Sequence, residues 1–217
     1  MKVLFGIAVV FIGVAAFVTT RPAETHVERT ATVKAPADVV FAQVDDFHQW
    51  AAWSPWDKLD PTMKKTYSGP SAGTGANYAW LGNDKAGEGS MTITKSRPNE
   101  ELSIRLVLLK PWQSTNVVTF SFKPSGDSTV LTWTMDRENN FMMKAVGIFT
   151  DMDKSIGVDF ERGLAALTNV AEAEAHRRAD EAKQNAEERT KKAADVTVAV
   201  DAAAMAPAAT NAHVRKK

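Results

Sequence analysis

Six short runs rich in threonine, valine, isoleucine and aromatic residues occupy the segment from Pro61 to Asp136. Turn-forming residues separate most of them, such as Gly82-Asn83-Asp84. Runs of this composition with such boundaries predict β-strands, and the short gaps between them favour antiparallel neighbours. In the later runs one face is consistently apolar and requires a cover. That face consists of Leu102, Ile104, Leu106 and Leu108; Val118, Phe120 and Phe122; and Leu131, Trp133 and Met135.

Residues 138–172 supply this cover. Their apolar residues recur in steps of three and four, at positions 141, 145, 149, 152, 156, 160, 164 and 167. This period predicts one continuous amphipathic helix of about seven turns, with Asn139 or Asn140 as its N-cap. Gly147, Gly157 and Gly163 interrupt the helix, which indicates close packing on the sheet or space left for a ligand.

The region before the strands contains one further strand and two short helices. Residues 26–34 alternate apolar and polar side chains, as in a half-buried strand. Pro36 then begins a short helix that carries apolar residues at positions 39, 40, 41 and 44. The stretch FHQWAAWSPWDK follows at residues 47–58, and Pro55 favours a second short helix that ends in a turn.

This order of elements resembles the helix-grip fold of the START-like superfamily, specifically the SRPBCC or polyketide cyclase/dehydrase-like proteins. The matching stretches are VERTATVKAPADVVFAQVDDFHQWAAWSPW, KKTYSGP, GEGSMTI and NNFMMKAVGIFTDMDKSIGVDFERGLAAL. The resemblance implies an α+β fold over residues 25–172, in which a seven-stranded curved antiparallel sheet wraps the long C-terminal helix and two short helices follow the first strand. It also implies that an apolar or amphipathic small molecule binds between the sheet and that helix.

The two ends of the chain differ from this domain. Val3 to Thr20 carry no charge, so residues 1–21 predict an uncleaved single-pass membrane anchor with the domain on the extracytoplasmic, periplasmic side; a cleaved signal peptide is the alternative. Residues 173–217 predict a charged, solvated helix followed by an alanine-rich disordered tail.

The composition limits the possible chemistry. The chain has no cysteine, and 26 basic residues balance 26 acidic ones, so thiolate sites are excluded and nothing favours nucleic acid as a partner. The four histidines are scattered and no metal-binding spacing occurs. We therefore expect no metal and no cofactor.

The candidate ligand-binding residues are aromatic, methionine and aliphatic side chains of the short helices, the strands and the long helix. Trp50, Trp53 and Trp56 lie within seven positions and either plug the core or line the mouth of a ligand site. Methionine and aromatic side chains on the strands form an adaptable apolar lining, or an ordinary core. The candidates are Trp53, Trp56, Tyr78, Trp80, Met91, Leu106, Phe120, Trp133, Met135, Phe149, Met152 and Ile156.

Three functions fit the sequence. The first is membrane-anchored, non-catalytic binding of a hydrophobic or lipid-like small molecule. The second is an enzyme of the polyketide cyclase/dehydrase type, which requires an ionisable group inside the cavity; Arg29, Tyr67 and Tyr78 are the candidates. The third is a membrane-associated interaction protein that docks through its charged helix and tail.

Overall fold

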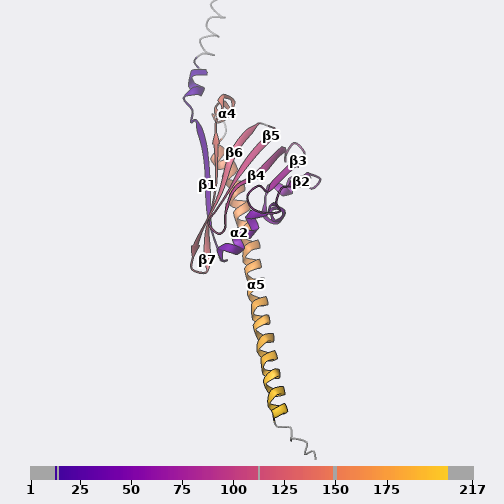
Figure 1. The fold of residues 1–217 in the computed structure, drawn as a ribbon. Coiled ribbons are helices and arrows are strands. Elements are labelled where there is room, and N and C mark those ends of the chain that lie inside the picture. Colours follow the sequence, from indigo (N-terminus) through magenta and orange to yellow (C-terminus); the bar gives the residue numbers. More distant parts are fainter. Residues whose placement is uncertain (1–12, 14, 112, 149–150, 205–217) are drawn as a thin grey trace, which may run out of the picture. The chain divides into compact units, whose positions relative to one another are not determined.

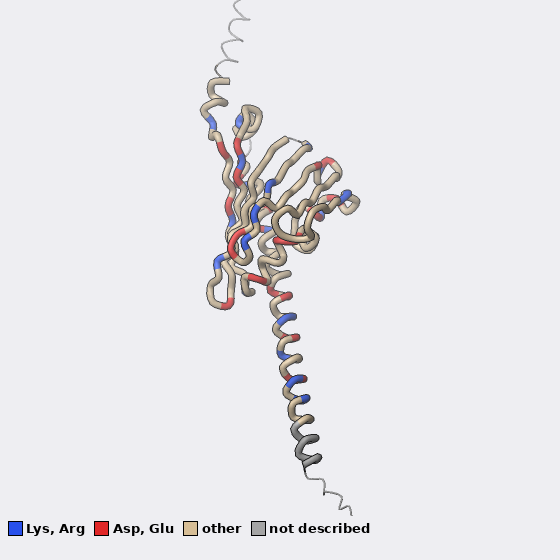
Figure 2. The backbone as a smooth tube through the Cα atoms, viewed as in Figure 1, with Lys and Arg blue, Asp and Glu red and all other residues tan. Residues whose placement is uncertain are grey.

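The computed structural model describes residue 13 and residues 15–111, 113–148 and 151–204. The chain divides into two compact units, Met1–Ala175 and His176–Lys217. In the second unit the described side chains are exposed, and basic and acidic residues alternate along its helix (Figure 2). Pairs such as Arg177 with Glu181 stabilise a solvated helix by about 0.2–0.5 kcal/mol each.

A seven-stranded antiparallel sheet forms the first unit (Figure 1). Its order is β1-β7-β6-β5-β4-β3-β2, so β2 to β7 form a meander and β1 pairs with the last strand. The sheet is curved, and the predicted helix-grip α+β fold is confirmed. The strands are β1 (Glu24–Val33), β2 (Lys64–Ser68), β3 (Asn77–Leu81), β4 (Glu88–Arg97), β5 (Glu101–Lys110), β6 (Ser114–Ser125) and β7 (Ser128–Glu138).

The alternation along the strands produces one buried face. In β7, Leu131, Trp133 and Met135 are buried, whereas the residues between them are more accessible. Because successive side chains of a strand point to opposite faces, these residues share the inward face. The predicted apolar face therefore turns toward the helices.

Short helices connect β1 to β2 and fix two indole rings. They are α2 (Ala37–Asp45), η1 (Phe47–Gln49), α3 (Trp50–Trp53) and η2 (Trp56–Lys58). The Nε1 of Trp50 donates to the carbonyl of Val44 at 2.9 Å, and the Nε1 of Trp53 donates to that of Gln43 at 3.0 Å. Both indoles are thus buried with their polar atoms satisfied.

The predicted continuous helix is divided into α4 (Phe141–Val146) and α5 (Met152–Ala204). Asn140 caps α4, because its side chain accepts a hydrogen bond from the backbone N–H of Met143 at 2.9 Å. Gly147 ends α4, and the side chain of Asp151 accepts from the N–H of Lys154 at the start of α5. The poor helix propensity of Gly147 and the new capping aspartate outweigh the continuous apolar period. The alanine-rich segment is helical through Ala204, and residues 205–217 lie outside the described residues.

The predicted single-pass anchor, and with it the extracytoplasmic location, is overturned. No helix among the described residues is long and apolar enough to cross a membrane. A crossing helix needs about 20 mostly apolar residues. Near the N-terminus only residues 13 and 15–19 are described as helical, and most of the predicted anchor, residues 1–12 and 14, lies outside the described residues. The long helix α5 is interrupted by charges throughout.

Candidate ligand-binding site

Strand register places six inward-facing side chains in one line across the sheet, which we call the cross-sheet row. Ladder pairs join Thr25 to Arg137, Asn116 to Leu106, Leu106 to Met91 and Met91 to Tyr78. The β6–β7 ladder pairs Val117 with Asp136, so the next residues along the two strands, Asn116 and Arg137, lie opposite each other. From β1 to β3 the row consists of Thr25, Arg137, Asn116, Leu106, Met91 and Tyr78.

Toward one end from this row, aromatic rings fill the space between the sheet and α5. We call Trp53, Trp56, Phe120, Trp133 and Phe160 the aromatic cluster. Trp133 stacks on Phe160 with ring centroids 4.1 Å apart and an interplanar angle of 12°. Trp53 meets both Phe120 and Trp133 edge-on, at 6.3 and 5.7 Å. Four of the five rings are at most 2 % exposed, so these rings form core.

The glycines of α5 permit this close packing. A Cβ atom built at Gly163 would lie 2.8 Å from Cζ3 of Trp133 and 3.3 Å from Cδ of Pro55. A Cβ atom at Gly157 would lie 1.9 Å from Nη2 of Arg29. Gly163 therefore requires the absence of a side chain, whereas a Cβ at Gly157 would have to displace the end of Arg29; close approach explains both glycines.

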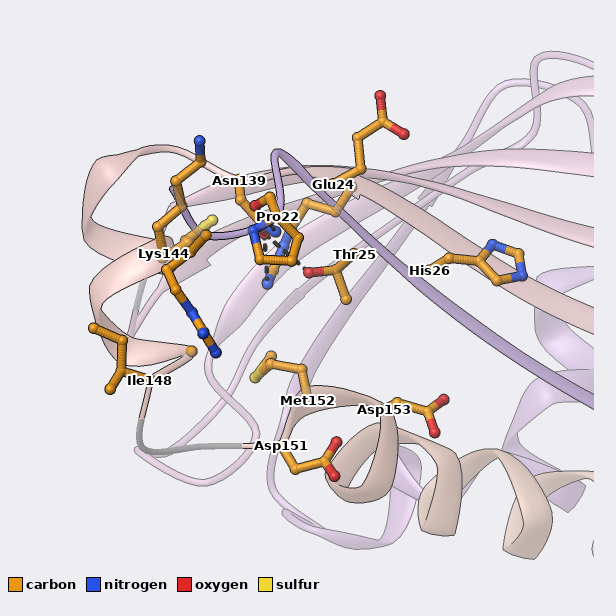
Figure 3. A pocket seen from close by; sticks show the side chains of 14 residues that line it. Pro22, Glu24, Thr25, His26, Asn139, Lys144, Ile148, Asp151, Met152 and Asp153 are labelled. Carbon is orange, nitrogen blue, oxygen red and sulfur yellow. Dashed lines mark hydrogen bonds between the residues drawn. The ribbon is translucent and has the colours of Figure 1, made fainter. Parts of the chain in front are cut away.

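At the other end of β1 and β7 the molecule contains a pocket of about 640 Å³ (Figure 3). The start of β1, the end of β7, α4 and the first turn of α5 form its walls. The volume lies within the roughly 300–1,000 Å³ typical of small-molecule sites. The lining residues are Arg21, Pro22, Glu24, Thr25, His26, Arg137, Asn139, Met143, Lys144, Gly147, Ile148, Asp151, Met152 and Asp153.

Arg137 joins this pocket to the cross-sheet row. Its Nη2 donates to Oδ1 of Asn139 at 3.3 Å, while its Nε is buried without a hydrogen-bond partner in the described part of the chain. Burial lowers the pKa of Arg137, since no compensating carboxylate acts on it. A buried donor left without a partner costs about 1–3 kcal/mol, and more when it is charged.

Asn139 is held in place beside this guanidinium. Its Oδ1 also accepts a hydrogen bond from Oγ1 of Thr25 at 3.0 Å, and its Nδ2 donates to the carbonyl of Pro22 at 3.3 Å. These contacts tie the residues before β1 to the end of β7. The pocket wall around Arg137 is therefore built from segments far apart in the sequence.

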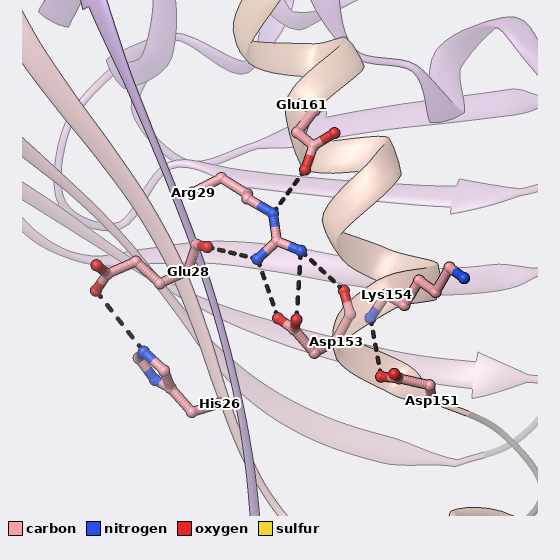
Figure 4. A network of polar contacts seen from close by, with 7 residues as sticks. All are labelled: His26, Glu28, Arg29, Asp151, Asp153, Lys154 and Glu161. Carbon is pink, nitrogen blue, oxygen red and sulfur yellow. Dashed lines mark hydrogen bonds and ion pairs between the residues drawn. The ribbon is translucent and has the colours of Figure 1, made fainter.

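A network centred on Arg29 connects β1 to the first turns of α5 (Figure 4). Its Nε donates to Glu161 at 2.8 Å, and its Nη1 donates to Asp153 at 3.0 Å and to the carbonyl of Glu28 at 2.7 Å. Hydrogen bonds to Asp153 and Glu161 raise the pKa of Arg29. Asp153 lines the pocket, and its carboxylate already forms an ion pair with Arg29.

A second polar group lies at the β2–β3 end of the sheet. The hydroxyl of Tyr78 donates to Oδ1 of Asp57 at 3.3 Å, and Lys65 pairs with the other oxygen of Asp57. Burial raises the pKa of Tyr78, with the charge of Asp57 as the next cause, so its hydroxyl remains protonated. The three side chains satisfy one another.

The residues predicted for ligand binding occupy three places. Trp53, Trp56, Phe120 and Trp133 belong to the aromatic cluster. Tyr78, Met91 and Leu106 lie in the cross-sheet row, with Trp80 and Met135 at neighbouring inward positions. Met152 and Ile156 lie in the first turns of α5, Met152 lines the pocket, and Phe149 lies outside the described residues.

Sequence reasoning missed the inward-facing Arg137. Its signal was present in the alternation of Leu131, Trp133 and Met135, which continues in step to position 137. Asn116 was missed in the same way, two positions before Val118.

The arrangement of sheet and helix agrees with comparisons to known proteins. Residues 24–172 match a family described as polyketide cyclase/dehydrase and lipid transport. The chain belongs to this family. A search of curated proteins found no match.

Several solved structures share the fold of this family member. A protein of Chromobacterium violaceum, CV1439, is 13 % identical with a TM-score of 0.50, and the match covers 70 % of this chain and 98 % of that one. MLL2253 of Mesorhizobium loti is 15 % identical with a TM-score of 0.50, over 67 % and 96 % of the two chains. The Aha1 dimer of Colwellia psychrerythraea is 15 % identical with a TM-score of 0.50, and the match covers 68 % of this chain and 96 % of that one. At these identities the likeness shows the fold alone.

Proposed function

We propose that this protein binds a hydrophobic small molecule, without turnover, in the pocket between the ends of β1 and β7, α4 and the start of α5. The observation that carries the proposal is the pocket of about 640 Å³ beside the inward face of the sheet. Its family, which includes lipid-transport proteins by description, supports a hydrophobic ligand.

The apolar wall of the pocket comes from Met143, Ile148 and Met152. Methionine side chains are flexible and polarisable, so they adapt to ligands of different shape. Burial of apolar ligand surface contributes a binding free energy of about 25 cal/mol per Å². The entropic cost of association opposes this gain. The aromatic cluster is already filled by its own rings, which favours this pocket over the tryptophan-lined end.

The contacts of Tyr78, an acid or base candidate in the cross-sheet row, favour binding over catalysis. A cyclase or dehydrase needs an acid or base that faces its substrate. Tyr78 instead donates to Asp57, which pairs with Lys65. Conversion of any host metabolite by the purified protein would refute the absence of turnover.

The test has two parts. Native mass spectrometry of the chain purified from its natural host should reveal a retained mass that extracts into organic solvent. Calorimetric titration of the full-length chain with decanol, a neutral apolar probe, should give saturable binding. If neither a retained mass nor decanol binding is found, the proposal is rejected.

A pair of variants localises the site. Met152→Asp places a charge in the apolar wall and should weaken decanol binding by about tenfold or more, because a charge must then be desolvated. Ser155→Asp adds the same charge at an exposed position on the next turn of α5 and should leave binding unchanged. Equal effects of the two substitutions would contradict the assignment to this pocket.

A further inference from the structure

Arg137 is an unusual residue for the inward face of this sheet. Along β7 it continues the buried series Leu131, Trp133 and Met135, and it faces Thr25 across the ladder to β1. Charged side chains are rare at such positions unless something pairs with them. The guanidinium therefore requires an explanation beyond packing.

The protein itself leaves this guanidinium incompletely bonded. Within the described ranges it makes one long hydrogen bond, to the amide oxygen of Asn139, and its Nε has none. The acidic residues nearest in sequence, Asp136 and Glu138, lie on the opposite face of β7, and Asp136 binds His26. Of the three acidic residues that line the pocket, Glu24 lies on the opposite face of β1, Asp151 accepts from the N–H of Lys154, and Asp153 is bound by Arg29. A planar anion entering the pocket would supply the missing acceptor.

The charge of the pocket selects the kind of anion. Its permanently charged lining residues are the cations Arg21, Arg137 and Lys144 and the acids Glu24, Asp151 and Asp153; His26 also lines it, and its ring bonds Asp136 outside the lining. These permanent charges balance, and the three carboxylates repel a singly charged ligand less than a doubly charged phosphate, which favours a single negative charge. A carboxylate also matches the flat fork of arginine.

We propose that the pocket binds an amphipathic carboxylic acid, with its carboxylate on Arg137 and its apolar body against Met143, Ile148 and Met152. This inference rests on the proposed function and names the ligand class of the same site. Arg137 then acts as the group that selects acids over neutral molecules of equal size. Asn139, fixed by Thr25 and Pro22, holds the guanidinium toward the ligand.

The experiment compares decanoate with decanol, which have the same carbon chain and differ in the head group. Both are titrated calorimetrically into the full-length chain at neutral pH. Decanoate should bind about tenfold more tightly than decanol, because its head group gains charge-assisted hydrogen bonds. In Arg137→Gln this preference should disappear, while decanol affinity is kept and reports that the variant is folded.

Arg105→Gln is the matched control. Arg105 is also a strand arginine, but it is exposed on β5 and does not line the pocket. Its substitution removes the same charge and should leave the preference for decanoate intact. A preference that survives in Arg137→Gln, or that falls equally in both variants, would overturn the role of Arg137.

The two proposals fail in different ways. Decanol binding with no preference for decanoate in the wild-type chain refutes the acid-selective site and leaves hydrophobic binding standing, whatever the variants do. Binding of neither molecule refutes the proposed function, and the inference about Arg137 falls with it.

Discussion

Alanine at position 163 tests whether the contact between α5 and the aromatic cluster is as tight as described. The new Cβ would lie 2.8 Å from Cζ3 of Trp133, well inside van der Waals contact. The indole has little room to retreat, because Phe160 stacks on it at 4.1 Å and Phe120 lies at 4.8 Å. Overpacking of this kind costs about 1–3 kcal/mol. Replacing a glycine inside a helix by alanine stabilises the helix by about 1 kcal/mol, which offsets part of this cost.

Since the indole is confined by rings, we expect the upper part of that range and a net loss of about 1–2 kcal/mol. For a domain of this size the loss lowers Tm by about 2–8 °C, which thermal unfolding followed by circular dichroism measures. Gly157→Ala should cost less, because its Cβ meets the flexible end of Arg29. Ser155→Ala, at an exposed position, is the control for helix propensity. A higher Tm for Gly163→Ala would refute the packing argument.

Two further substitutions test polar contacts. Thr129→Val keeps the shape of a fully buried side chain but removes the hydroxyl that donates to the carbonyl of Ala35 at 2.8 Å; denaturant unfolding should show a loss of about 1–3 kcal/mol, and an unchanged midpoint would contradict this role. Asp136→Asn should bring the pKa of His26 down toward 6.5, because a hydrogen bond to Asp136 is the main cause of its raised value. Protonated His26 stabilises the fold below the unfolded-state pKa, and this contribution disappears as pH rises through the higher folded-state pKa, so the loss of Tm in the variant should be larger at about pH 5 than at about pH 9. A histidine titration by NMR that is the same in both proteins would exclude the proposed pairing.

The sequence predicts the sheet well because its strands obey a short-range rule. Alternation at Val118, Phe120 and Phe122 places these residues on one face whatever their partners are. The break at Gly147 was harder to predict, since the apolar period continues through it. There local capping by Asn140 and Asp151 decides where α4 and α5 begin.

The site was less predictable than the fold. The alternation of side chains along β7 correctly predicts that Trp133 points inward. It does not reveal that Phe160 and Trp53 fill the space beside that ring. Nor does the sequence place Arg137 beside Thr25, because they are 112 positions apart and meet only through the pairing of β1 with β7. The pocket depends on such long-range register, which one sequence does not specify.

The tryptophan packing also gives the protein a spectroscopic property. The ring centroids of Trp50 and Trp53 are 4.6 Å apart, and those of Trp53 and Trp133 are 5.7 Å apart. Excited states of indoles this close couple, so the near-ultraviolet circular dichroism reports their mutual arrangement. The described lining of the pocket contains no tryptophan, tyrosine or phenylalanine. Unfolding should therefore change this spectrum strongly and ligand entry hardly at all, so the two events can be followed independently in one sample.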